Sequence, residues 1–115
     1  MITRYALFEG SIREGQGDAF RRAVLDELVP TWRAFPGVLA VRVSFALERD
    51  EGAPEIAMIL AVDYPDRRAM DAALASDARK ISRATTERLI PQFFAGRIHH
   101  HIAEPHLFPP TDKPL

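Results

Sequence analysis

The segment EIAMILAVDY at residues 55–64 is the strongest constraint on the fold, because its side chains are apolar at odd and even positions alike. Successive side chains of a strand point to opposite faces of a sheet, so this segment presents apolar groups on both faces. Such a strand is expected at the centre of a sheet, with cover above and below it. The sequence therefore predicts a sheet that removes both of its faces from water.

The preceding segment, VLAVRVSFALE at residues 38–48, alternates in polarity and predicts a strand with one buried face. RDEGAPE at 49–55 supplies the hairpin turn to the next strand. Two further strands are predicted at residues 3–12 and 97–103. One row of the alternating strand consists of Leu39, Val41, Val43, Phe45 and Leu47, and the other of Ala40, Arg42, Ser44, Ala46 and Glu48.

Two helical regions are predicted between these strands. Residues 18–35 have apolar residues at helical spacing, and Asp18 is suited to cap the helix. Pro30 lacks an N–H and predicts a bend or a second short helical piece. Pro65 and Asp66 open a short helix, and a longer helix follows to residue 94. The residues at helical spacing form a stripe along each long helix. In residues 18–35 this stripe is Phe20, Val24, Leu28, Trp32 and Phe35, and in the helix that ends near residue 94 it is Ile81, Thr85, Leu89 and Phe93.

The order strand, helix, strand, strand, helix, strand is that of the ferredoxin-like βαββαβ fold, an α+β architecture with a four-stranded antiparallel sheet. In this topology the first and third strands are central, and both helices cover one face. A chain of 115 residues rarely supports two cores, so residues 1–104 are predicted to form one domain. The proline-rich residues 105–115 are predicted to form a tail that cannot join a central ladder.

The uncovered face of this sheet is predicted to need a partner. The strand at residues 55–64 remains apolar on that side, where Ile59 and Phe8 are expected. A second copy packed face to face would cover it and form a barrel-like homodimer, with the tail free to clasp the partner. The alternative is a monomer that tolerates one wet face.

Composition excludes several classes of function. Lys and Arg number 15 against 16 Asp and Glu, which provides no basic surface for a nucleic acid. The absence of cysteine excludes disulfides and thiolate chemistry. The longest apolar run, residues 56–62, is too short to cross a membrane, and no secretory signal is apparent at the start. A cytoplasmic protein is expected.

Three segments, FPGVLAVRV, DYPDRRAMDAALAS and FFAGRIHHHIAE, resemble the EthD family of the dimeric α+β-barrel superfamily. The resemblance spans residues 3–104. It implies a homodimer with a pocket between helices and sheet or within the barrel, and a small apolar aromatic or polyketide-like molecule as ligand. The superfamily also contains cofactor-free antibiotic-biosynthesis monooxygenases. Members of the family carry a histidine late in the first helix, where this chain has LVPTW at residues 28–32.

The four histidines fall within RIHHHIAEPHLF at residues 97–108. On a strand, His99 and His101 point the same way, whereas His100 shares the other face with two isoleucines and is expected under the helices. His99 and His101 would then meet the polar row of the second strand on the uncovered face. The candidate catalytic residues are His99 and His101 as proton carriers and Arg42 as anion stabiliser. The candidate ligand-binding residues are Tyr5, Glu9, Ser44, Asp63 and Trp32.

Other interpretations of the histidines remain open. Two imidazoles with Glu9 or Asp63 could hold a metal, and one imidazole could ligate haem, although no cofactor is expected. They could also be exposed edge-strand residues without a function. The chain is therefore either a cofactor-independent monooxygenase, a lyase or isomerase working by proton transfer, or a non-catalytic ligand-binding or assembly module.

Overall fold

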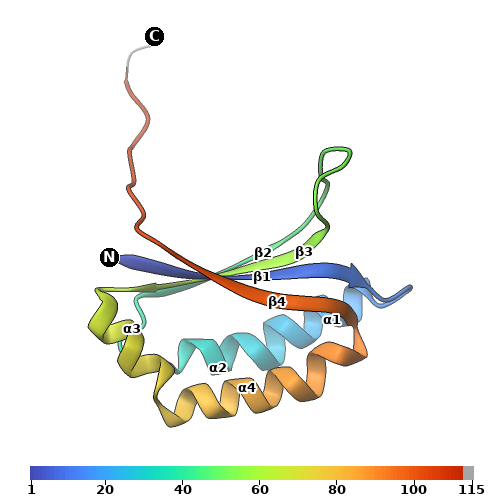
Figure 1. The fold of residues 1–115 in the computed structure, drawn as a ribbon, viewed down its shortest axis with the longest axis horizontal. Helices are drawn as coiled ribbons and strands as arrows, with labels where there is room; N and C mark the ends of the chain where they lie inside the picture. The colour runs from blue at the N-terminus through green and yellow to red at the C-terminus, as the bar shows by residue number, and fades with distance from the viewer. Residues whose placement is uncertain (113–115) are drawn as a thin grey trace.

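A computed structural model describes residues 1–112 as a four-stranded sheet with a layer of helices below it (Figure 1). Of the predicted tail at 105–115, the last three residues lie outside the described part, and the division at residue 104 remains a prediction. The elements are β1 (Ile2–Ile12), α1 (Gly17–Ala23), η1 (Val24–Leu28), α2 (Val29–Arg33), β2 (Ala40–Phe45), β3 (Ile56–Tyr64), α3 (Arg67–Leu74), α4 (Asp77–Leu89), η2 (Ile90–Gln92) and β4 (Phe94–Ala103).

The sheet has the order β2-β3-β1-β4 with every pair antiparallel, so the predicted ferredoxin-like fold and its central strands are confirmed. A β-bulge between Phe8 and Glu9 interrupts the pairing of β1 with β3. Beyond it, Gly10 lies opposite Gly96 of β4 and adopts a φ of +150°. A Cβ on either glycine would collide with the backbone of the other strand, so β1 and β4 approach closely there.

The first helical region is one rod in three pieces, as the proline predicts. A π-helical turn, η1, separates α1 from α2, and the N–H of Val29 bonds to the carbonyl of Val24. The wide turn directly precedes Pro30, which has no N–H to donate to the helical ladder. The cap prediction was wrong: α1 begins at Gly17, and Asp18 lies in the first turn, where its charge favours the positive end of the helix dipole.

The second helical region is divided as expected. The carboxylate of Asp66 accepts from the N–H of Ala69 at 2.8 Å and caps α3, and Ser76 caps α4. The predicted stripe of α4 is only partly right, because Leu89 is buried whereas Ile81 is 62% exposed. Ser82 is buried instead, so α4 turns a more polar side to the sheet than its apolar spacing predicts.

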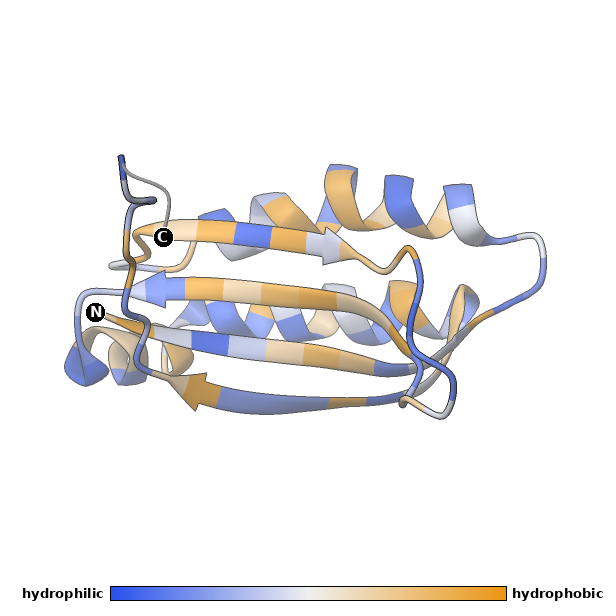
Figure 2. Ribbon diagram, turned by 90° about the horizontal axis from the view of Figure 1, so that it is seen from above, coloured by the Kyte–Doolittle hydropathy of each residue, from blue (hydrophilic) through white to orange (hydrophobic). Residues whose placement is uncertain are grey.

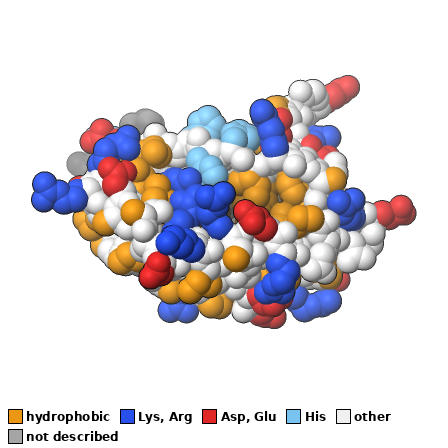
Figure 3. Space-filling view, turned by 60° about the horizontal axis from the view of Figure 1, so that its bottom comes forward, with side chains coloured by type: hydrophobic (Ala, Val, Ile, Leu, Met, Phe, Trp, Pro, Cys, Tyr) orange, Lys and Arg blue, Asp and Glu red, His pale blue; other side chains and the backbone are white. Residues whose placement is uncertain are grey.

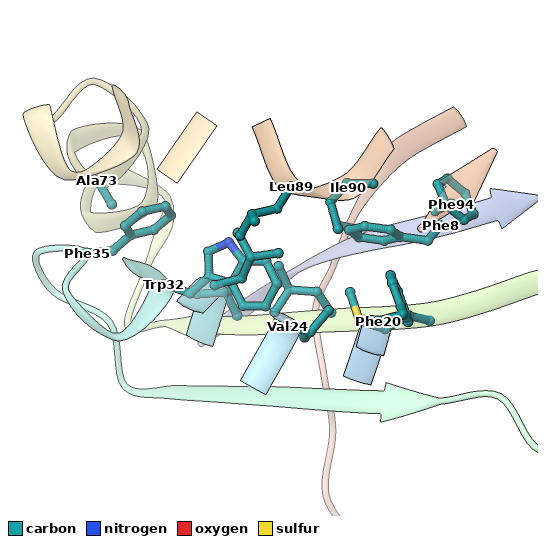
Figure 4. Close-up of a cluster of buried hydrophobic side chains, with 14 of the residues drawn as sticks. Phe8, Phe20, Val24, Trp32, Phe35, Ala73, Leu89, Ile90 and Phe94 are labelled. Atoms are coloured by element: carbon teal, nitrogen blue, oxygen red, sulfur yellow. The ribbon is translucent and has the colours of Figure 1, made fainter. Parts of the chain in front are cut away.

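The core lies between the sheet and the helices (Figure 4). Trp32 and Val24 of the first rod, Leu89 of α4 and Phe8 of β1 meet there, and the rings of Phe8 and Phe94 pack edge to face at 5.8 Å. Phe8 is 2% exposed and faces the helices, so its predicted place on the uncovered face was wrong. Even-numbered positions of β1, not odd ones, supply this core.

The opposite side of the sheet is the helix-free face, seen from above in Figure 2, where the ribbon of β3 is coloured mostly as hydrophobic and much of β4 as hydrophilic. The tail leaves β4 on this side, away from the helices (Figure 1). The strand register assigns to this face Thr3, Tyr5, Leu7 and Glu9 of β1, Ile59, Ala61 and Asp63 of β3, Ala40, Arg42 and Ser44 of β2, and Arg97, His99, His101 and Ala103 of β4.

Candidate functional site

A pocket of about 420 Å³ lies between the helices and the sheet. Its volume falls within the range of small-molecule sites, and aromatic and aliphatic side chains form much of its wall. Strands β1, β3 and β4 supply its roof and helices α2 and α4 its floor. Its lining consists of Arg4, Ala6, Phe8, Trp32, Phe35, Leu60, Val62, Tyr64, Arg79, Ser82, Arg83, Thr86, Glu87, Ile98 and His100.

The pocket exists because α4 does not fill the space below the sheet. At the positions where this helix faces the pocket it carries Arg79, Ser82 and Thr86, and the two small side chains leave volume that a leucine would occupy. The hydroxyl of Thr86 donates to the backbone carbonyl of Ser82 at 2.8 Å, so its hydrogen-bonding capacity is turned toward the helix. The Thr86 hydroxyl is therefore already engaged within its own helix.

One end of the pocket is positively charged. Arg4 of β1 and Arg79 of α4 are half-buried, and within residues 1–112 no carboxylate forms an ion pair with either guanidinium. Arg83, one turn further along α4, has Glu87 at 3.9 Å. Figure 3 shows Lys and Arg side chains gathered beside the histidines on the side of the molecule that carries the helices. This end can attract a negatively charged group.

His100 stands at the same end, opposite Ala6 in the strand register. His100 is an exposed residue, yet the partial burial of its ring lowers the pKa of His100 to about 4, and Arg4 and Arg79 lower it further. At neutral pH the ring is therefore uncharged and can offer one donor and one acceptor. Burial raises the pKa of Tyr64, which is 1% exposed and also lines the pocket.

Only one of the predicted site residues lies in this pocket. Trp32 is 4% exposed and forms part of its wall. The other seven, His99, His101, Arg42, Tyr5, Glu9, Ser44 and Asp63, lie on the helix-free face. The sheet separates these two groups, so they do not form one site within a single chain.

On the helix-free face, four of the residues do come together. Nε2 of His99 lies 3.0 Å from a carboxylate oxygen of Glu9, and its Nδ1 lies 3.2 Å from Nε2 of His101. Arg97 donates to the same carboxylate at 3.3 Å. The hydrogen bond from Arg97, with the contact from His99, lowers the pKa of Glu9. Tyr5 lies opposite His101. The result is a chain of polar groups at one edge of an apolar surface.

The remaining predicted residues stand apart from this chain. Arg42 lies opposite Ala61, which lies opposite Tyr5, so two strands separate Arg42 from the histidines. With strands about 4.8 Å apart, that is roughly 14 Å. Ser44 is likewise at the far edge, and Asp63 accepts from the hydroxyl of Thr3 at 2.6 Å. Only a second copy could bring Arg42 next to these histidines.

Sequence reasoning missed four residues of the charged end: Arg4, Tyr64, Arg79 and His100. The alternation of the last strand did assign His100 to the buried side, but no role followed from it. A stronger signal was available in α4, where small polar and basic residues occupy positions facing an apolar sheet. A helix that covers a sheet with such residues leaves either a cavity or an unpaired charge beneath it.

The described residues contain neither a group of side chains suited to a metal ion nor a helix suited to a membrane. Within residues 1–112, no three His, Asp or Glu side chains come together as a group that could hold a metal ion. Over the same residues, every helix is too short or too polar to span a lipid bilayer.

Solved structures with this fold include an EthD family protein. That protein, from Bacillus halodurans, has a TM-score of 0.73 and 19% identity, covering 92% of this chain and 99% of its own. HapK from Hahella chejuensis has a TM-score of 0.63 and 20% identity, covering 98% and 100%. A putative antibiotic biosynthesis monooxygenase from Deinococcus radiodurans has a TM-score of 0.61 and 15% identity, covering 96% and 98%. No family model matches the sequence, and no curated protein does. The chain thus has the ferredoxin-like α+β fold of these proteins, which confirms the EthD resemblance at the level of fold.

Proposed function

We propose that the pocket between the sheet and the helices binds a small, mainly apolar aromatic or polyketide-like molecule. The observation that supports this most is a 420 Å³ cavity beside a well-packed core, lined by Trp32, Phe35 and Phe8 and charged at one end. Apolar walls with a few convergent polar groups are typical of ligand sites. The names of the structural neighbours, EthD and antibiotic biosynthesis monooxygenase, agree with a small organic ligand.

The chemistry proposed for this pocket needs no resident cofactor. One reaction is proton transfer to or from the bound molecule, for which the neutral His100 is placed at the charged end. The other is oxygenation by dioxygen, with an electron-rich ring of the substrate as the reductant. One oxygen atom would enter the ring, and the other would leave as water with two hydrogens from the substrate. The alternative on the same fold is a carrier or sensor that binds without turnover.

A homodimer through the helix-free face belongs to this proposal. Leu7, Tyr5 and Ile59 form an apolar strip on the helix-free face of the two central strands, which the layer of helices does not cover. Burying such a strip against a second copy would stabilise the pair by the hydrophobic effect. The same contact would enclose the Glu9, His99 and His101 chain and could add Arg42 of the other copy. This enclosed face is the second candidate site, and the 3.0 Å contact of His99 with Glu9 supports it.

Trp32 provides a direct test, because it is the only tryptophan of the sequence and it lines the pocket. Its indole N–H gives one cross-peak in a proton–nitrogen correlation spectrum. We expect that peak to shift saturably when naphthalene-2-carboxamide or 2-naphthoate is added to the full-length protein. Calorimetry on the same samples would give the affinities. Loss of any saturable response to both probes would overturn the proposal.

A matched pair of substitutions locates the response. Thr86 lines the pocket and Thr85 does not, yet each hydroxyl donates to the backbone carbonyl four residues earlier. Thr86→Phe should fill the cavity and weaken binding of both probes by about tenfold or more, since a blocked pocket loses most of its buried contact. Thr85→Phe should leave the affinities nearly unchanged. Equal effects of the two substitutions would assign the probes to another surface.

A further inference from the structure

Resting on the proposed function, we infer that the natural ligand of the pocket carries a deprotonated oxygen, a carboxylate or an ionised phenol or enol, which Arg4 and Arg79 hold together. The observation behind this inference is the imbalance of charge at one end of the cavity. Three arginines but only one carboxylate, that of Glu87, line the pocket. Glu87 lies beside Arg83, which leaves the other two cations without a counter-charge among residues 1–112.

The guanidiniums of Arg4 and Arg79 are close enough to repel each other. Arg79 lowers the pKa of Arg4, after burial, which is the larger cause. Burial also lowers the pKa of Arg79, with Arg83 adding to the effect. Two like charges that are half removed from water destabilise the unliganded protein relative to one in which a counter-ion is present. An anion bound between them would remove that repulsion.

The arginines also approach from different layers of the molecule. Arg4 comes from the central strand β1 and Arg79 from α4, so they line the cavity from the sheet side and from the helix side. A guanidinium presents a planar fork of donors that matches two oxygens of a carboxylate. Two such groups on opposite walls would position an oxyanion between layers and leave its apolar body against Trp32 and Phe35.

His100 and Tyr64 complete this end without adding charge. The ring of His100 is neutral at pH 7, because its pKa is lowered to about 4. A protonated histidine would be a third cation beside two, and burial disfavours it. The neutral imidazole can instead donate one hydrogen bond to the ligand oxygen. Tyr64 offers a hydroxyl, whose pKa burial raises, so it stays protonated as a donor.

The experiment compares probes that differ only in charge. 2-Naphthoate and naphthalene-2-carboxamide have the same ring system, and only the first is an anion at pH 7. We expect the naphthoate to shift the Trp32 indole peak with an affinity about tenfold higher, because charge-assisted hydrogen bonds are about twice as strong as neutral ones. Arg4→Gln and Arg79→Gln should each reduce the naphthoate affinity by about tenfold and change the amide affinity by less than about twofold.

Arg88→Gln is the matched control. It removes one positive charge from the same helix, but Arg88 lies outside the pocket lining. It should leave both affinities within about twofold, which excludes an effect of net charge alone. Equal affinity for naphthoate and amide in the wild type would overturn the inference while leaving the proposed function intact. A naphthoate affinity that survives both arginine substitutions would overturn it as well. Absence of binding by both probes would instead overturn the proposed function.

A third probe separates the two sources of the oxyanion. 4-Nitrophenol titrates near neutral pH, and its visible absorbance reports the ionised form directly. If the site accepts phenolates, the protein should lower the apparent pKa of the bound phenol, and Arg79→Gln should reduce that shift. An unshifted titration together with a preference for naphthoate would select a carboxylate as the group recognised.

Discussion

His99 and His100 are adjacent in the sequence but lie on opposite faces of the sheet. His99 contacts Glu9 at 3.0 Å on the helix-free face, whereas His100 lines the pocket under the helices beside Arg4 and Arg79. The alternation of a strand alone produces this separation. One short segment therefore contributes to two surfaces with different chemistry, and substitutions in it should have separable effects.

Substitution of His99 and His101 distinguishes the two candidate sites. If the pocket is the binding site, the His99→Ala, His101→Ala double variant should bind both naphthalene probes within about twofold of wild type, because distant sites act independently. His100→Ala should weaken the naphthoate. Calorimetry of the three proteins would check this. A large loss of affinity in the double variant, in a dimer of normal stability, would move the ligand to the helix-free face.

The pH dependence of stability should carry the signature of His100. Its pKa is lowered from 6.5 to about 4 in the folded protein, so the unfolded chain takes up a proton first as pH falls. The contribution of neutral His100 to the free energy of unfolding is therefore fully present above pH 6.5 and is lost as pH falls toward about 4. His100→Gln should flatten the curve of unfolding free energy against pH in that window. Urea unfolding of both proteins at matched pH would show it, and a His100 proton NMR titration centred near 6.5 would contradict it.

The close approach of the paired strands β1 and β4 should leave no room for a side chain at Gly10 or Gly96. A Cβ at Gly96 would meet the carbonyl of Glu9, and one at Gly10 would meet Ala95 at a backbone φ of +150°. Each alanine substitution should lower the free energy of unfolding by about 1–3 kcal/mol, from strain and displaced pairing. Gly17→Ala is the control, because nothing lies near Gly17 at the start of α1, and the substitution should change the free energy of unfolding by less than about 0.5 kcal/mol. Similar values for all three would contradict the close approach.

Charge on the helix-free face should prevent the proposed dimer. Leu7→Asp or Ile59→Asp would bury a carboxylate in the apolar strip, which costs far more than the pair gains from contact. The mass in dilute solution should fall from two chains to one, as measured by light scattering. Leu25→Asp is the control, since Leu25 is half exposed on the helical side. A wild-type mass of one chain would contradict the dimer itself.

Much of the site's surroundings could be predicted from the sequence, because alternation fixes which face a strand residue occupies once one face is known. His99, His101, Arg42 and Ser44 were expected on the helix-free face, and they lie there. The error at Phe8 has a local origin. Both rows of β1 contain apolar residues, so its pattern does not decide which row faces the helices.

The pocket could not be predicted in the same way. Its charged end combines Arg4, Arg79 and His100, which lie in three elements far apart in the chain. Arg4 and Arg79 each look like a solvated residue in their own segments, and Ile81, which looks like core, is 62% exposed. The rotation of α4 about its axis determines which of its residues faces the sheet, and that rotation is set by packing against α2 and the strands.

The sequence by itself determined the order of the elements, the antiparallel sheet and the two-faced character of the last strand, because these follow from local periodicity and from the chain's need to bury its apolar rows. Tertiary structure alone decided that small side chains of α4 would leave a cavity and that it would be lined by two arginines with no ion-pair partner among residues 1–112. The physical reason is that volume and electrostatic repulsion depend on distances between elements, which no local pattern contains.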